Sequence, residues 1–182
     1  MKVFVTGGTG FIGQNTVKRL IELGHECICL VRGSSKKDLL ESMGCQLVIG
    51  DITDKNSLTK GMTGCNSVIN LANLYSLWEP DISLYKKINV DGTRNVMQAS
   101  LETGIKKVVH VSSIVIWGKS PEHPFTESSP VGEQTSEYAR TKYEGDQVAW
   151  DLYKNKDLPL VMIYPCGVLG ADDPKSTGNH VK

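Results

Sequence analysis

The sequence has no long hydrophobic run. Its 182 residues contain no stretch approaching 18 apolar residues, and the first apolar run ends at the glycines that follow Thr6. A membrane-spanning helix needs about 20 apolar residues, and the apolar core of a signal peptide needs about 7 to 15. We therefore expect neither segment and predict a cytoplasmic protein.

The chain also lacks an excess of charge of either sign. Its 20 Lys and Arg residues balance 20 Asp and Glu residues, so the formal net charge at pH 7 is +0. A chain without net charge has no overall field that attracts nucleic acid or an anionic membrane. We therefore predict a small-molecule partner, recognised by neutral groups or local charge, and neither a nucleic-acid nor a membrane partner.

Residues that bind metals or form disulfides are few and scattered. The five cysteines include no C-x-x-C pair, and the four histidines include no H-E-x-x-H pattern. These spacings are the ones from which metal sites are predicted. We expect no metal and reduced, buried thiols at Cys27, Cys29, Cys45, Cys65 and Cys166.

The sequence does contain a regular alternation of short apolar runs and helical stretches. Strands are predicted at residues 2–6, 26–31, 46–49, 67–71, 107–112 and 160–164. Helices are predicted at residues 11–23, 36–42, 55–60, 82–103 and 134–155. Because parallel strands need a helix to return the chain, this order predicts a doubly wound α/β fold: a parallel sheet covered by helices on both faces, in three layers.

The predicted helix over residues 82–103 has one apolar face. Its members are Leu84, Ile88, Gly92, Val96 and Ala99. We expect this face to pack on the sheet, with Gly92 allowing a close approach.

Glycines fill the turn between the first strand and the first helix. Residues 7–13 read Gly-Gly-Thr-Gly-Phe-Ile-Gly, which satisfies both G-x-x-G-x-x-G and G-x-G-x-x-G. Residues without a Cβ let the backbone approach a pyrophosphate, and the helix that follows presents unpaired N–H groups and a positive dipole end. The position at the start of a βαβ unit predicts dinucleotide binding and a Rossmann domain.

The end of the second strand favours NADP over NAD. Dinucleotide-binding domains that use NAD place a carboxylate there, about 20 residues past the glycines, to hold the ribose 2′-hydroxyl. Here the segment carries Arg32 and Lys36 and no carboxylate. Arg32 is suited to a bidentate pair with a 2′-phosphate, although a solvated arginine at a strand end is the alternative.

A tyrosine and a lysine lie one turn apart on the last long helix. Tyr138 and Lys142 stand at i and i+4, so they share one helical face. A nearby lysine cation favours phenolate, and we therefore expect Lys142 to lower the pKa of Tyr138. Ser112 and Ser113 end the fifth strand, at the sheet edge where ligands of open parallel sheets bind.

With these motifs in place, the chain resembles the extended short-chain dehydrogenase/reductase superfamily, also described as the NAD-dependent epimerase/dehydratase family. The resemblance runs from residue 1 to about residue 170. It rests on the glycine turn, residues 50–54, residues 89–95, the Ser-Ser stretch, and Tyr138 with Lys142.

The resemblance implies roles for individual residues. Tyr138 would be the general acid/base, Lys142 would bind the nicotinamide ribose and tune Tyr138, and Ser113 would orient the substrate carbonyl. Asn89 matches the family's asparagine on the fourth helix, although helix packing alone would also explain it. The catalytic candidates are Ser113, Tyr138, Lys142 and Asn89.

The resemblance also implies a set of cofactor contacts. Asp51 would accept from the adenine amino group, or would serve only as a turn residue before a helix, while Ile52 packs on the ring. Residues 164–168 would line the nicotinamide through backbone contacts. The candidates are Gly7, Gly10, Phe11, Ile12, Gly13, Arg32, Lys36, Asp51, Ile52, Leu71, Ala72, Tyr138, Lys142, Tyr164, Pro165 and Val168.

Residues 74–80, with Val31 and Arg32, look most like the dihydroflavonol-4-reductase-like branch. Three features depart from the family pattern. Asn-Leu-Ala-Asn at residues 70–73 replaces His-x-Ala-Ala, Trp117 stands where Tyr is usual, and the C-terminal substrate domain is missing. We therefore predict a dinucleotide-binding domain over residues 1–170 and a loop over residues 171–182 that leads toward the absent domain.

The leading hypothesis is an NADP(H)-dependent oxidoreductase that transfers a hydride between nicotinamide and a carbonyl or alcohol substrate. One alternative is a nucleotide-sugar epimerase or dehydratase with tightly bound NAD. Another is a non-catalytic module that senses the dinucleotide. The resemblance also allows a homodimer, although no feature of residues 134–155 establishes one.

Overall fold

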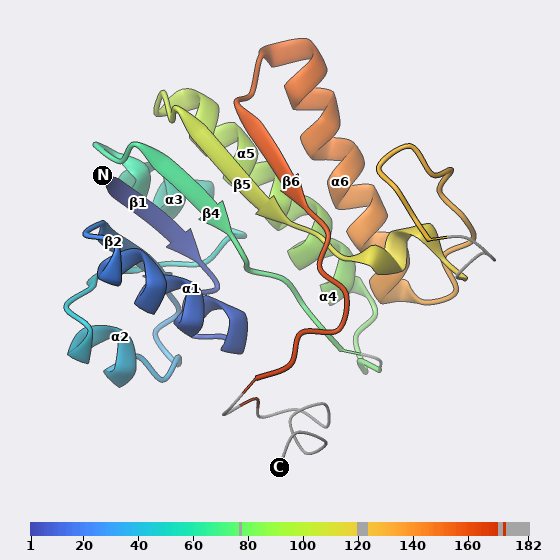
Figure 1. The fold of residues 1–182 in the computed structure, drawn as a ribbon. Helices are drawn as coiled ribbons and strands as arrows, with labels where there is room; N and C mark the ends of the chain where they lie inside the picture. Colours follow the sequence, from blue (N-terminus) through green and yellow to red (C-terminus); the bar gives the residue numbers. More distant parts are fainter. Residues whose placement is uncertain (77, 120–123, 171–172, 174–182) are drawn as a thin grey trace.

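The computed structural model describes residues 1–76, 78–119, 124–170 and 173. Six parallel strands form one sheet in the order β3-β2-β1-β4-β5-β6 (Figure 1). The strands are β1 (Lys2–Thr6), β2 (Glu26–Val31), β3 (Gln46–Ile49), β4 (Ser67–Asn70), β5 (Lys107–Val111) and β6 (Leu160–Ile163). The order reverses direction between β1 and β4, which is the topological switch point where open α/β sheets bind ligands.

Helices cover both faces of the sheet (Figure 1). They are α1 (Phe11–Glu22), α2 (Asp38–Ser42), α3 (Lys55–Met62), α4 (Ser83–Tyr85), the π-helical turn η1 (Lys86–Gly92), α5 (Thr93–Glu102), the 3₁₀ turn η2 (Ile114–Trp117) and α6 (Glu137–Lys156). The predicted doubly wound, three-layer fold is confirmed, and the predicted strands agree with the observed ones to within a residue at each end.

Strand alternation divides the core into two apolar clusters. Successive side chains of a strand point to opposite faces. On β1, Val3 and Val5 join a cluster with Val17 of α1 and Leu40 of α2. Phe4 faces the other way, into the larger cluster under α3, α5 and α6. Each face of the sheet is therefore covered by its own set of helices.

The helical stretch predicted over residues 82–103 is observed, and the carboxyl-terminal part of its predicted apolar face is buried, but the register predicted for its amino-terminal part is wrong. A π-helical turn, η1, joins α4 to α5 without a break. The wider turn rotates the amino-terminal part, so Tyr85, Asn89 and Val90 are buried there while Leu84 is only half-buried. Gly92 also differs from expectation: a Cβ at Gly92 would meet the Ile52 side chain, 2.6 Å from Cδ1, and not the sheet.

All five cysteines are free thiols. Four of them are buried or half-buried as predicted, whereas Cys166, which follows β6, is exposed and corrects that expectation. Of the helices within the described residues, none is long and apolar enough to cross a membrane. The loop predicted over residues 171–182 lies outside the described residues except for Asp173.

Candidate active site

A cavity of about 740 Å³ opens at the carboxyl ends of the strands. It is within the size range of small-molecule and cofactor sites. Its walls come from the turn after β1, the loop after β2, the segments that follow β3, β4, β5 and β6, and one side of α6. Segments distant in the sequence therefore meet at the switch point of the sheet.

The glycine turn forms one wall of this cavity, and its geometry depends on missing side chains. Gly7 has a φ of +71°, and a Cβ there would lie 2.7 Å from the backbone nitrogen of Ala72. A Cβ on Gly13 would lie 2.1 Å from the Gly7 carbonyl oxygen. A Cβ on Gly10 would lie 3.4 Å from the Gly7 carbonyl oxygen and near no other atom. Gly7 and Gly13 thus let the turn pack tightly, and Gly10 leaves space on the cavity side.

Helix α1 begins directly after this turn and points its amino end at the cavity. Gly10 is the N-cap and provides no side-chain hydrogen bond. The N–H groups of a helix's first turn have no partner within the helix. Phe11, Ile12 and Gly13 line the cavity, so this helix end is placed to bind an anionic group such as a pyrophosphate.

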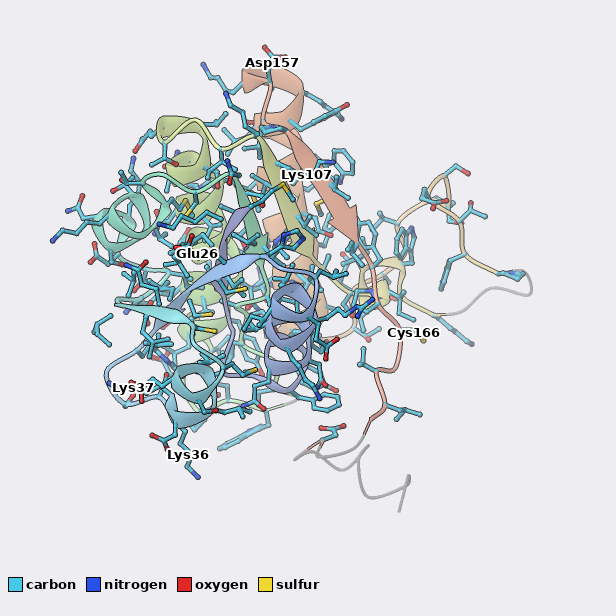
Figure 2. All side chains as sticks on the ribbon, turned by 60° about the vertical axis from the view of Figure 1, so that its left-hand side comes forward. Glu26, Lys36, Lys37, Lys107, Asp157 and Cys166 are labelled. Atoms are coloured by element: carbon cyan, nitrogen blue, oxygen red, sulfur yellow. The ribbon has the colours of Figure 1, made fainter. Side chains whose placement is uncertain are left out.

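The loop after β2 brings Arg32 and Ser35 to the cavity. Arg32 is exposed, and its guanidinium presents donors for a phosphate. Lys36, a predicted cofactor contact, is exposed and does not line the cavity. Figure 2 shows the Lys36 and Lys37 side chains extending outward beside α2.

The resemblance assigns Asp51 and Ile52 to the adenine, and both residues follow β3 at the cavity. Both line the cavity, and Ile52 is 7% exposed. Asp51 Oδ1 accepts from the Thr53 N–H and from the Thr53 hydroxyl, both at 2.8 Å. Asp51 is therefore a turn residue before α3 as well as a cavity residue, and a carboxylate has further acceptor sites for a ligand.

Tyr138 and Ser113 meet at the opposite end of the cavity. Tyr138 is 8% exposed and lines the cavity together with Ser113. The expected lowering of its pKa is not found: burial raises the pKa of Tyr138 to about 12, and a side-chain hydrogen bond with Ser113 acts in the opposite direction. Burial raises the pKa because desolvation disfavours phenolate, and Lys142 is not among the groups that shift it.

Lys142 lies behind the cavity wall. It is 3% exposed, and its Nζ donates to the Val111 carbonyl oxygen at 3.0 Å. An ammonium has three N–H donors, so this bond leaves two for other acceptors. Val111 itself lines the cavity, which places the Lys142 cation just beneath the end of β5.

Asn89, on η1, is 2% exposed and does not line the cavity. Its Oδ1 accepts from the Leu74 N–H at 2.7 Å, and its Nδ2 donates to the Thr141 hydroxyl at 3.1 Å. Leu74 and Tyr75 do line the cavity, and the Tyr75 ring meets the Tyr138 ring edge to face at 5.2 Å. Asn89 therefore links the loop after β4, which lines the cavity, to α6.

The segment after β6, which the resemblance assigns to the nicotinamide, forms another wall of the cavity. Pro165, Cys166 and Val168 line the cavity. Tyr164 does not: its ring packs on Trp117, and its hydroxyl accepts from Trp150 Nε1 at 3.3 Å. Burial raises the pKa of Tyr164 to about 12.

The structure thus brings most predicted site residues to one cavity. Predicted residues that do not line it are Lys36, Asn89, Lys142 and Tyr164. Cavity residues that the sequence analysis missed include Ser35, Leu74, Tyr75 and Val111. The signal that would have found Tyr75 is its position just after a strand at the switch point.

These residues fit a dinucleotide. The tight glycine turn, the helix end and the arginine suit the phosphates, and a phenol stands at the far end. Within the described part of the chain, no group of three or more His, Cys, Asp or Glu side chains could hold a metal ion.

Comparison with known proteins gives consistent matches. The model of the NAD dependent epimerase/dehydratase family matches residues 3–181. The Synechocystis protein named "Putative dihydroflavonol 4-reductase" is 36% identical over 177 residues, covering 96% of this chain and 51% of that protein. A UDP-glucose 4-epimerase of Yersinia pestis is 29% identical over 202 residues, covering 100% of this chain and 59% of that protein.

Among solved structures, the chain is similar to DesIV, a dTDP-glucose 4,6-dehydratase from Streptomyces venezuelae, with NAD and TYD bound. The TM-score is 0.82 at 28% identity, over 89% of this chain and 54% of that one. The chain therefore spans about half the length of the proteins that it matches.

Proposed function

Because the chain belongs to the NAD-dependent epimerase/dehydratase family, we propose that it is an NADP(H)-dependent oxidoreductase acting on a carbonyl or alcohol substrate. The observation that carries this proposal is the position of Tyr138. Its phenol lines the same cavity as the glycine turn and Ser113. A binding module has no need of a buried proton donor at the cofactor cavity.

Tyr138 is suited to giving a proton to a substrate oxygen. The nicotinamide, when bound, supplies or takes the hydride at the neighbouring carbon. With a pKa of about 12, Tyr138 is protonated at neutral pH, which is the form needed to protonate the oxygen of a carbonyl undergoing reduction. This protonation state favours the reductive direction.

Ser113 and Lys142 support this step. Ser113 is half-buried at the carboxyl end of β5, where its hydroxyl can hold both the phenol and the substrate oxygen. Lys142 retains two N–H donors for ribose hydroxyls below Tyr138. These roles follow the family resemblance and agree with the contacts of each side chain.

We assign NADP over NAD on the strength of Arg32. Arg32 and Ser35 line the cavity, and no carboxylate stands between residues 30 and 37. A guanidinium favours a 2′-phosphate, and a missing carboxylate removes the repulsion that would oppose it.

The second candidate is a nucleotide-sugar epimerase or dehydratase with tightly bound NAD. The matched UDP-glucose 4-epimerase and the NAD-bound dTDP-glucose 4,6-dehydratase favour it. Purification of the chain with bound NAD, and conversion of a nucleotide sugar without net cofactor consumption, would support this candidate over the reductase.

Tyr138→Phe tests the proposed function. The variant should lose turnover by roughly 10²–10⁴-fold on a panel of aldehydes and ketones with NADPH, because general acid catalysis contributes about that factor. NADPH affinity should stay close to that of the parent chain. Tyr153→Phe, at an exposed tyrosine of the same helix, is the matched control. Undiminished turnover by Tyr138→Phe would reject the assignment.

A further inference from the structure

Three polar side chains form a row across the middle of the sheet. Thr6 on β1, Asn70 on β4 and His110 on β5 are register partners along this row. All three are almost fully buried, at 0%, 1% and 1% exposed. Buried polar groups are costly unless they are hydrogen-bonded, so the row requires partners.

Hydrogen bonds run along the row in one direction. The Thr6 hydroxyl donates to Asn70 Oδ1 at 2.5 Å and accepts from the Ala72 N–H at 3.3 Å. Asn70 Nδ2 lies 3.0 Å from His110 Nδ1. Because an amide nitrogen can only donate, Nδ1 is the acceptor, and the proton of the neutral imidazole lies on Nε2. Burial lowers the pKa of His110, which favours this neutral form.

The row ends at the carboxylate of Asp146 on α6. Asp146 is 1% exposed, and its Oδ2 accepts from Ser112 Oγ at 2.6 Å. Its Oδ1 faces His110 Nε2 at 3.6 Å, longer than a hydrogen bond, and has no hydrogen-bond partner among the described residues. A buried carboxylate in this position needs a compensating positive charge nearby.

That charge is the ammonium of Lys142. Lys142 and Asp146 are four residues apart on α6, so they lie on the same face of the helix. Lys142 Nζ donates its hydrogen bond to the Val111 carbonyl oxygen. The Lys142 ammonium and the Asp146 carboxylate attract each other through space. Such attraction is stronger in a buried site than at the surface.

We propose that Asp146 is a positioning residue of the active site, which keeps the Lys142 ammonium charged without occupying the two N–H groups that remain after its bond to Val111. The role of Lys142 in this proposal rests on the proposed function. Ser112 has a distinct task from Ser113: its hydroxyl donates to the Asp146 carboxylate, whereas Ser113 lines the cavity together with Tyr138.

The electrostatics of the site agree with this arrangement. Burial lowers the pKa of Lys142 to about 8, and the Asp146 charge acts in the opposite direction. Removing the carboxylate would lower this pKa further, so that Lys142 would lose its proton closer to neutral pH.

Among the described residues, the other groups that face this pair carry no charge at neutral pH. His110 on β5 is kept neutral by burial and by the Lys142 cation. Tyr138 and Tyr164 both have a pKa raised to about 12 and feel the Asp146 charge. Asn89 of η1 and Thr93 of α5, which pack on α6 at Gly145, do not ionise.

The test is the titration of Lys142 in the Asp146→Asn variant. The chain is labelled with ¹⁵N-lysine, and the Nζ resonance is assigned by its loss in Lys142→Met. The midpoint should fall by about 1 pH unit or more, the effect expected of losing a neighbouring opposite charge. Asp151→Asn, at an exposed carboxylate of the same helix, should leave the midpoint unchanged.

An unchanged midpoint in Asp146→Asn would overturn the proposal. Asp146→Ser, a smaller neutral side chain that retains a hydroxyl for Ser112, is the second variant if Asp146→Asn does not fold. The titration needs neither substrate nor turnover, so its outcome is separate from that of Tyr138→Phe. If the oxidoreductase function also holds, the alkaline limb of the pH–rate profile should shift to lower pH together with the Lys142 midpoint. Structural damage would instead lower the rate at every pH.

Discussion

The Asn89 side chain bonds both backbone polar groups of Leu74: Oδ1 accepts from the Leu74 N–H at 2.7 Å, and Nδ2 donates to the Leu74 carbonyl oxygen at 3.3 Å. The next residue, Tyr75, packs its ring on Tyr138. A side chain on η1 thereby determines where the cavity loop after β4 stands relative to α6.

Asn89→Ala should therefore loosen this loop. Loss of the buried hydrogen bonds should lower the free energy of unfolding by about 1–3 kcal/mol and raise KM for carbonyl substrates more than it lowers kcat. Urea unfolding and steady-state kinetics measure the two effects. Asn95→Ala, which removes a side-chain bond from α5 to the Ile52 carbonyl oxygen in the turn before α3, is the comparison. A loss confined to kcat would instead support the direct catalytic role that the family resemblance implies.

Arg32→Ala should weaken NADPH binding selectively. A hydrogen bond to a charged group contributes about 1.5–3 kcal/mol, so Kd for NADPH should rise roughly 10- to 100-fold while Kd for NADH stays the same. Fluorescence titration with both cofactors measures the ratio. Arg19→Ala, an exposed arginine paired with Glu22 on α1, should change neither value. Equal weakening of both cofactors would argue against a 2′-phosphate contact.

Gly13→Ala should disrupt the phosphate turn. The new Cβ would lie 2.1 Å from the Gly7 carbonyl oxygen, so the turn and α1 must move apart, at a cost of about 1–3 kcal/mol. We expect lower thermal stability and loss of dinucleotide binding by calorimetry. Gly33→Ala, where a Cβ meets nothing within 4 Å, serves as the control and should bind normally. Normal binding by Gly13→Ala would contradict the observed packing.

Cys166 should report cofactor binding by its reactivity. It is exposed and lines the cavity, whereas Cys27, Cys29 and Cys65 are buried. Burial raises the pKa of Cys27 to about 11, which makes its reactive thiolate rarer. Maleimide should label Cys166 first, and saturating NADPH should slow that labelling. Cys166→Ser should remove the fast phase; labelling at the same rate with and without NADPH would place the cofactor elsewhere.

Local patterns were sufficient for the parts of this protein that depend on neighbours in the sequence. Apolar runs and their spacing predicted all six strands, since period and length are properties of one segment. The glycine turn and the Tyr138–Lys142 pair were equally visible, because a turn and one helical face involve only a few consecutive residues.

Tertiary structure decided the properties that come from burial and from register between segments. Burial, which no local spacing reports, raises the pKa of Tyr138 where its lysine neighbour predicted a fall. The row from Thr6 to Asp146 exists because three strands align and α6 places Asp146 beside the last of them. The π-helical turn likewise places Asn89 against Leu74. The sequence alone determined the fold and the cofactor class expected of it, whereas long-range packing determined the electrostatic environment in which the site residues lie.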